Sequence, residues 1–258
     1  MPTFDAADGT SLFYDDQGEG TVVLLLHGFV GDVNIDWVRS GILDRLLDEG
    51  YRTVAHDARG HGLSDKPHDV DAYTGDALER DASALLDTLG VEQCFVVGFS
   101  MGARSAMRLA TLDDRVRGIA ALGLGETSLR ATPVDADGNS RTWDRSALPD
   151  ALLTDDPDSI ADAGLRRYRE MADAIRADRV ALAALMSAPR IALADFVDDV
   201  HVPVVVVTGR DDVAAGSPEG LAARLADATA VTTEGDHAGV KDQPATHEAI
   251  VEFLARHA

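Results

Sequence analysis

The sequence contains one cysteine and two lysines among its 258 residues. The single cysteine, Cys94, excludes an intramolecular disulfide and a zinc site built from cysteine ligands. Cys94 begins an apolar run that predicts a strand, so we expect a buried and inert thiol. Lys66 and Lys241 are the two lysines, and all the other basic residues are arginines.

Positive charge is scarce altogether. Lys and Arg number 23 against 45 Asp and Glu, which gives a formal net charge of −22. Such a surface repels nucleic acid and anionic membranes, so neither is an expected partner. The acidity fits an adaptation to high salt, but the favoured interpretation is a solvated acidic face combined with a GC-rich coding bias towards Ala, Asp and Arg. It carries no information about a reaction.

Long apolar runs are also absent. None approaches the ~20 residues of a membrane-spanning helix. Residues 1–5 do not form a basic segment followed by a long apolar run, so no signal peptide is evident. We therefore expect a cytoplasmic protein. A length of 258 residues with 45% hydrophobic residues suits one globular fold of ordinary composition.

Ser100 lies in the most informative stretch, residues 96–102, which is Val-Val-Gly-Phe-Ser-Met-Gly. The apolar residues 94–97 predict a short buried strand, and residues 103–109 predict a helix. A strand that turns this sharply into a helix leaves no room for side chains beside the turn, and Gly98 and Gly102 supply that room. Ser100 is then strained and exposed at a helix start, where backbone N–H groups favour developing negative charge. The pattern predicts a nucleophilic serine.

Strands and helices alternate along most of the chain. Apolar runs favour strands at 22–26, 51–55, 116–122, 204–208 and 230–233, and helical spacing favours helices at 42–47, 78–89, 221–225 and 249–254. This alternation predicts a parallel, doubly wound sheet. Residues 4–6 and 11–14, separated by Asp8-Gly9, predict an antiparallel hairpin at the edge of that sheet.

A serine nucleophile requires a base and an acid that orients the base. After a strand–serine–helix turn these follow in the chain order Ser, Asp or Glu, His. The strand at 204–208 is followed by Asp211 and Asp212, and the strand at 230–233 is followed by Gly235-Asp236-His237. His237 is therefore the candidate base, and the acid is one of the two adjacent aspartates.

With these stretches identified, the chain resembles the α/β-hydrolase superfamily, in particular its small esterase and haloperoxidase-like members. The resemblance extends over essentially the whole chain. It includes residues 24–29, Leu-Leu-Leu-His-Gly-Phe, and residues 57–64, Asp-Ala-Arg-Gly-His-Gly-Leu-Ser, which look like the family's oxyanion-loop strand and its Asp-x-Arg-Gly-His-Gly-x-Ser loop. It implies the α/β-hydrolase fold, with a core of residues 1–124 and 201–258 and a helical cap at residues 125–200.

The resemblance also assigns site residues. Family members usually carry Gly-x-x-Asp after the strand at 204–208, and counting from Gly209 gives Asp212 as the acid, with Asp211 as the alternative. The backbone N–H groups of Phe29 and Met101 are expected to form the oxyanion hole. His27 lies at a strand end before the serine, and we interpret it as structural rather than as the base.

The implied activity is that of a serine hydrolase, carboxylesterase-like, which cleaves a small-molecule ester through an acyl-enzyme. Ser100 would attack the carbonyl, His237 would accept its proton, and Asp212 would hold the imidazole. No metal or organic cofactor is needed. A serine at this position speaks against the dehalogenases and epoxide hydrolases of the superfamily, which use an aspartate there. C–C bond hydrolases, lactonases, thioesterases and perhydrolase-type haloperoxidases remain alternatives, as does a non-catalytic ligand-binding protein. The oligomeric state is open between monomer and homodimer.

Helices are expected in the cap at 159–175 and 179–186, after a loop at 131–138 that is rich in Pro, Asp and Gly. Helical spacing gives the first of these helices an apolar face towards the body, formed by Tyr168, Met171, Ala172 and Ile175. Packing of the cap on the body is the favoured role for Tyr168, Met171 and Met186. The late histidines His247 and His257 are expected to be exposed.

Overall fold

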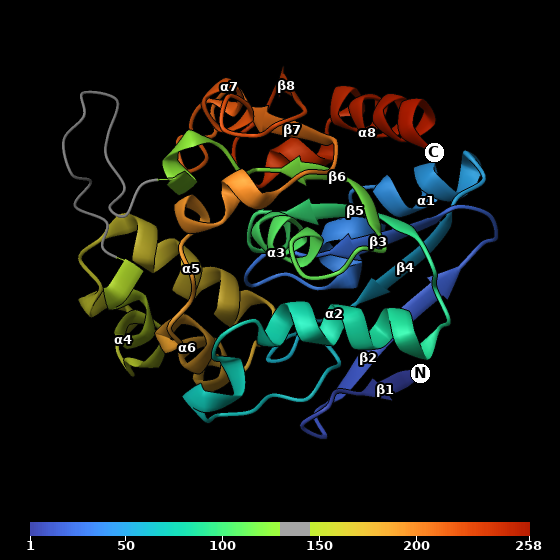
Figure 1. Cartoon of the computed structure of the whole chain (residues 1–258). Helices are drawn as coiled ribbons and strands as arrows, with labels where there is room; N and C mark the ends of the chain where they lie inside the picture. Colours follow the sequence, from blue (N-terminus) through green and yellow to red (C-terminus); the bar gives the residue numbers. More distant parts are fainter. Residues whose placement is uncertain (130–144) are drawn as a thin grey trace.

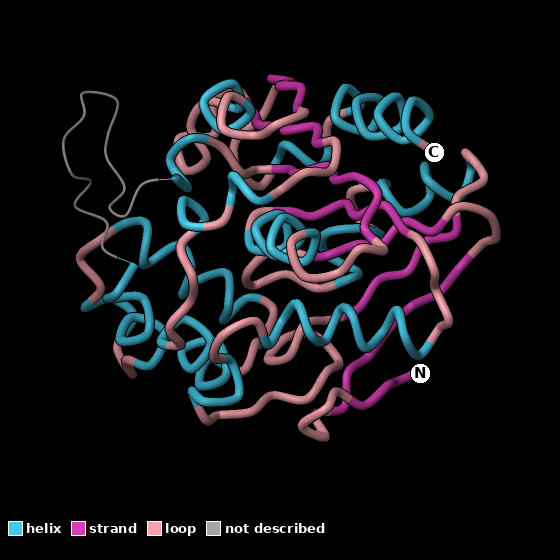
Figure 2. The backbone as a smooth tube through the Cα atoms, viewed as in Figure 1, coloured by secondary structure: helices cyan, strands magenta, loops and turns pink. Residues whose placement is uncertain are grey.

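The computed structural model describes residues 1–129 and 145–258, and within these ranges eight strands form one sheet (Figures 1 and 2). Their order across the sheet is β1-β2-β4-β3-β5-β6-β7-β8. The strands are β1 (Thr3–Asp5), β2 (Ser11–Gln17), β3 (Val22–Leu26), β4 (Arg52–His56), β5 (Cys94–Phe99), β6 (Val116–Leu122), β7 (Val204–Gly209) and β8 (Ala228–Thr233). β2 pairs antiparallel with β1 and β4, and the other neighbours are parallel. The predicted parallel sheet with an antiparallel edge hairpin is confirmed.

Helices cover both faces of the sheet, which explains why β3, β5 and β7 are buried along their whole length. One face packs on α2 (Ala77–Thr88), α3 (Met101–Ala110) and α7 (Pro218–Ala222). The other packs on a short π-helix (Asn34–Val38), α1 (Ile42–Asp48) and α8 (Pro244–His257). Cys94 lies inside the sheet, so its predicted burial is confirmed, and that burial raises the pKa of its thiol to about 12.

The remaining helices are α4 (Leu148–Leu153), α5 (Ala163–Ala174) and α6 (Arg179–Ser187). Figure 1 shows them gathered beside the end of the sheet towards which β5 and β6 point. They share a hydrophobic cluster with Val30 of the loop after β3. The loop expected at 131–138 lies outside the described residues, and the division into a core and a cap at 125–200 stays a prediction.

Several element boundaries differ from the sequence prediction for local reasons. The helix expected at 159–175 begins only at Ala163, because the Asp162 side chain accepts a hydrogen bond from the Leu165 N–H and caps it there. The helix expected at 221–225 instead runs over Pro218–Ala222, with Ser217 as its cap and proline in its first turn.

The burial of two side chains differs from the sequence prediction. Ile175 was expected in the apolar face of α5, but it is 41% exposed because α5 ends at Ala174. His247 is half-buried rather than exposed, and its Nε2 donates to the carbonyl of Lys241.

Within residues 1–129 and 145–258, no helix combines the length and the apolar character needed to cross a membrane. The cytoplasmic location inferred from the sequence stays a prediction.

Candidate active site

Ser100 lies at the turn between β5 and α3 with φ 51° and ψ −106°, a conformation that side-chain-bearing residues rarely adopt. The two glycines beside it are required by close approach. A Cβ on Gly98 would lie 2.4 Å from the Gly102 carbonyl oxygen, and one on Gly102 would lie 1.8 Å from the Leu26 carbonyl oxygen. The turn therefore packs directly on the end of β3. The strained serine that the sequence predicts is present, but it is half-buried rather than exposed.

His237 joins Ser100 to Asp212. Its Nε2 lies 2.9 Å from Ser100 Oγ, and its Nδ1 lies 2.8 Å from Asp212 Oδ2. A carboxylate only accepts, so Nδ1 donates to Asp212 and the unprotonated Nε2 accepts from the Ser100 hydroxyl. Three residues from three different loops are thus connected in one line.

Asp212, and not its neighbour Asp211, faces the histidine. Asp212 is buried, and its second oxygen, Oδ1, accepts the N–H groups of Ala214 at 3.0 Å and Ala215 at 2.9 Å. Asp211 is exposed. The Asp212 carboxylate is therefore held rigidly by the backbone of its own loop and aims one oxygen at His237.

The backbone N–H groups of Phe29 and Met101 lie on the two segments that meet at Ser100. Met101 is the first residue of α3, so its N–H has no acceptor within the helix. The loop around Phe29 is fixed on both sides, because Gly28 N–H donates to Asp36 Oδ2 at 2.8 Å and Gly31 N–H donates to the Gly28 carbonyl at 3.1 Å. Neither the Phe29 nor the Met101 N–H has an acceptor within the described ranges.

Buried histidines support the loops near the site. His27 Nε2 accepts the Ala58 N–H at 2.9 Å and its Nδ1 donates to the Gly28 carbonyl at 2.8 Å, which is a structural arrangement. The His61 ring packs edge-on against His27 and Phe29. Burial holds the pKa of His61 well below its ordinary value and lowers the pKa of His56 to about 4. His56 and His61 are therefore neutral at pH 7.

The loop of residues 57–64 is held in place near the site by hydrogen bonds and an ion pair of its own polar side chains. Asp57 accepts the N–H groups of Val33 at 2.8 Å and Leu63 at 2.7 Å. Arg59 forms a buried ion pair with Asp81, with guanidinium–carboxylate distances of 2.6 and 2.7 Å. Both side chains are anchored by charge-assisted hydrogen bonds, which explains the polar character of a buried loop.

Residues of α5 and α6 contact the same segments. The Tyr168 ring lies 5.8 Å from the Phe29 ring, and Met101 packs in a cluster with Leu185 of α6. Arg167 pairs with Asp236, the residue before His237, at 3.3 Å. The helical segment therefore touches the loops that carry Phe29, Met101 and His237.

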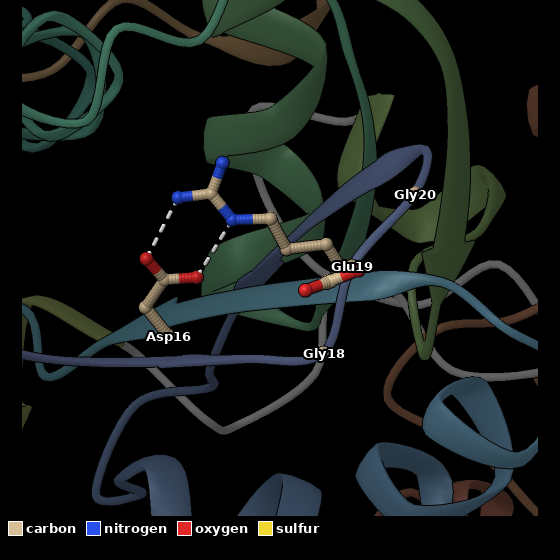
Figure 3. Close-up of a pocket in the computed structure, with 5 residues that line it drawn as sticks. Asp16, Gly18, Glu19 and Gly20 are labelled. Carbon is tan, nitrogen blue, oxygen red and sulfur yellow. Dashed lines mark hydrogen bonds and ion pairs between the residues drawn. The ribbon is translucent and has the colours of Figure 1, made fainter.

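A surface depression elsewhere on the molecule is not part of this site. Figure 3 shows it lined by Asp16, Gly18, Glu19, Gly20 and Arg52. Arg52 begins β4, whereas Ser100 follows the far end of β5, so the depression lies at the opposite end of the sheet. The Arg52 guanidinium is paired with the Asp16 carboxylate through two hydrogen bonds of 2.8 and 2.7 Å. Within the described residues no cluster of His, Cys, Asp and Glu is arranged to hold a metal ion.

Comparison with known proteins identifies the family to which the chain belongs. Residues 21–215 match the family model described as alpha/beta hydrolase fold. The chain belongs to the alpha/beta hydrolase fold family. The matched range includes Ser100 and Asp212, and His237 follows it.

The relatives to which this alpha/beta hydrolase is similar are named for different activities. It is 35% identical over 130 residues to an epoxide hydrolase of Caballeronia sordidicola and 37% identical over 111 residues to a non-heme haloperoxidase of Rhodococcus erythropolis. These stretches cover 48% and 42% of this chain but only 39% and 38% of the relatives. A thermophilic esterase from Thermogutta terrifontis aligns over 100% of both chains with a TM-score of 0.77 at 24% identity, which shows a shared fold.

Sequence reasoning missed two buried charged residues close to the site, Asp36 and Lys241, whose side chains are 3.7 Å apart. No motif contains either residue. The one signal in the sequence was the rarity of lysine.

Proposed function

We propose that this alpha/beta hydrolase is a serine hydrolase that cleaves a small-molecule ester through an acyl-enzyme. The observation that supports it is the line Ser100–His237–Asp212, with hydrogen-bonding distances of 2.9 and 2.8 Å. A nucleophile within reach of a base, with the base oriented by a third group, is the arrangement that activates a serine hydroxyl.

In the proposed reaction His237 accepts the Ser100 proton through Nε2 as the hydroxyl oxygen attacks the ester carbonyl. The Asp212 carboxylate stabilises the imidazolium that results. The N–H groups of Phe29 and Met101 bind the oxyanion, and both are available for it because neither has an acceptor among residues 1–129 and 145–258. His237 then protonates the leaving alcohol, and the same imidazole activates the water that hydrolyses the acyl-enzyme.

The serine at position 100 argues against epoxide hydrolysis, the activity named for the Caballeronia sordidicola relative. In the superfamily, epoxide hydrolases carry an aspartate where this chain has Ser100. Perhydrolase-type haloperoxidases share the serine triad, so the haloperoxidase relative makes that activity the second candidate. C–C bond hydrolysis, lactone hydrolysis and thioester hydrolysis use the same three residues and differ in the pocket.

We further propose that residues 125–200 form a cap over Ser100 that selects substrates. The contacts of α5 and α6 with Phe29 and Met101 support this role. A covered site excludes water and strengthens the electrostatic interactions of the oxyanion hole.

The decisive test is covalent labelling with a fluorophosphonate. Ser100→Ala should abolish labelling, whereas Ser105→Ala, which removes a buried hydroxyl from the same helix, should label like the wild type. A panel of p-nitrophenyl esters of graded length, a lactone, a thioester and a peroxide-dependent bromination assay then ranks the reactions. Labelling of Ser100→Ala at the wild-type rate would show that the nucleophile is a different residue.

A further inference from the structure

Lys241 lies in the 3₁₀ turn Gly239–Asp242, four residues after His237, and is only 8% exposed. A buried ammonium group is costly unless it is paired and hydrogen-bonded. Its contacts reach three segments that are far apart in the sequence, and each of these segments carries a residue of the proposed reaction.

The first contact is with the histidine loop, because Lys241 Nζ donates to the carbonyl of Ala238 at 2.9 Å. The second is with the end of β5, where Nζ lies 5.4 Å from the ring centroid of Phe99, the residue before Ser100. That ring is itself 5.2 Å from the His237 imidazole. The cation therefore lies against the aromatic ring on which the histidine packs.

The third contact is with the loop after β3, through Asp36. Lys241 Nζ is 3.7 Å from Asp36 Oδ1, while Asp36 Oδ2 accepts the N–H of Gly28 at 2.8 Å. Gly28 immediately precedes Phe29, whose N–H we assign to the oxyanion hole. The Asp36 carboxylate also lies against Gly31, where a Cβ would approach Oδ2 to 2.4 Å. Asp36 thus binds the backbone before Phe29 through Gly28 and packs against the backbone after it at Gly31.

Stability alone does not account for this pair. Replacing a buried ion pair by apolar residues of similar volume is often neutral or stabilising, because both charges must leave water. The segments joined by Lys241 are instead those whose relative placement controls the geometry of the reaction. Oxyanion donors must lie 2.7–3.1 Å from the developing charge, and a misplacement of about 1 Å can cost about 10²-fold in rate.

We infer that Lys241 is a positioning residue, which holds the oxyanion loop at residues 27–31 and the histidine loop at residues 237–242 in fixed relation to Ser100 through Asp36, Ala238 and Phe99. This inference rests on the proposed serine hydrolase function. It adds a residue that no motif of the sequence contains and that does not touch the reacting atoms.

The test compares Lys241→Met, Lys241→Arg and a control, Arg224→Met, by steady-state kinetics with p-nitrophenyl acetate and by thermal unfolding. Arg224 forms an exposed ion pair with Asp198, so the control removes one paired cation from elsewhere. We expect Lys241→Met to lower kcat about 10- to 100-fold while KM changes little. Lys241→Arg should recover most of kcat, and Arg224→Met should match the wild type.

A packing role would instead lower the unfolding temperature of Lys241→Met and leave kcat unchanged in the folded variant, which would overturn the inference. If Lys241→Met does not fold because Asp36 is left unpaired, the neutral pair Asp36→Asn/Lys241→Met takes its place. Slow turnover by that folded double variant supports the inference, and wild-type turnover overturns it.

Ser100→Ala is measured alongside these variants. Esterase activity that survives in Ser100→Ala contradicts the proposed function itself. Activity that depends on Ser100 but is unaffected in the Lys241 variants overturns only the positioning role.

Discussion

Asp212→Asn tests the proposed orientation of the histidine with almost no change in shape. In the protein, Asp212 Oδ2 accepts from His237 Nδ1, and Oδ1 accepts from Ala214 and Ala215. An asparagine can keep its carbonyl oxygen on the two backbone N–H groups, and its NH₂ group then faces Nδ1. That group only donates, so the imidazole has to place its proton on Nε2 and can no longer accept the proton of Ser100.

The expected loss follows from this change of tautomer. The corresponding substitution in a Ser-His-Asp protease lowers kcat about 10⁴-fold, and the same loss here corresponds to about 5 kcal/mol of transition-state stabilisation. KM should change little, because Asp212 is buried behind His237 and is removed from the substrate. The stability loss should be small as long as the bonds to Ala214 and Ala215 persist.

The assay is kcat and KM for p-nitrophenyl acetate, with Asp211→Asn as the matched control. Asp211 is the exposed neighbour in the same loop, so its neutralisation should change kcat by less than about threefold. The reverse order of effects would move the acid to Asp211. Equal and small effects would show that His237 does not depend on a carboxylate, and the proposed mechanism would be wrong.

Two further predictions concern acid stability and the cap. His56 has a pKa of about 4 in the folded chain against an ordinary 6.5, so the unfolded chain binds more protons between these values and stability falls as pH decreases from about 6.5 to about 4. Urea unfolding at pH 7 and 4.5 should show that the decrease in unfolding free energy between these pH values is about 2 kcal/mol smaller in His56→Phe than in the wild type. Replacing the exposed His201 should leave this decrease unchanged. An unchanged decrease in His56→Phe contradicts the assignment. For the cap, Tyr168→Ala should alter the kcat/KM ratio of a long to a short acyl ester by about tenfold, and the exposed Ile175→Ala should not. A constant ratio in both would place selectivity in the sheet and its loops.

The core of the fold could be predicted because its strands are buried on both faces. The strand at 22–26 is an uninterrupted apolar run whose bounds match β3 residue for residue. The predicted bounds 116–122 also match β6, although this run contains the exposed Arg117. Ser100 could be located because a tight turn between a strand and a helix requires glycine at fixed positions. Spacing from Gly209 selected Asp212, the aspartate that faces His237 in the structure.

Features that depend on contacts distant in sequence could not be predicted. The pairing of Asp36 with Lys241 joins residues about 200 positions apart, and no sequence pattern around either residue indicates that they pair. Ile175 has the right spacing for the apolar face of α5, but the helix ends before it. The half-buried His247 likewise reflects its bond to the Lys241 carbonyl rather than any pattern in α8.

Strand order accounts for how four loops meet at Ser100. Strands β3, β5, β7 and β8 are parallel, so the loops after them, which carry Phe29, Ser100, Asp212 and His237, emerge at one edge of the sheet. β3 is the direct neighbour of β5, which brings Phe29 beside the turn, but β6 lies between β5 and β7.

His237 follows the edge strand β8 and has to reach back over the ends of β7 and β6. The residue directly after β6 is Gly123, and a Cβ there would lie 2.8 Å from the Phe99 ring and 3.2 Å from His237 Cε1. The missing side chain at Gly123 therefore leaves the space through which the imidazole reaches Ser100. A side chain at this residue, which lies outside every motif, would press on both the Phe99 ring and the His237 imidazole.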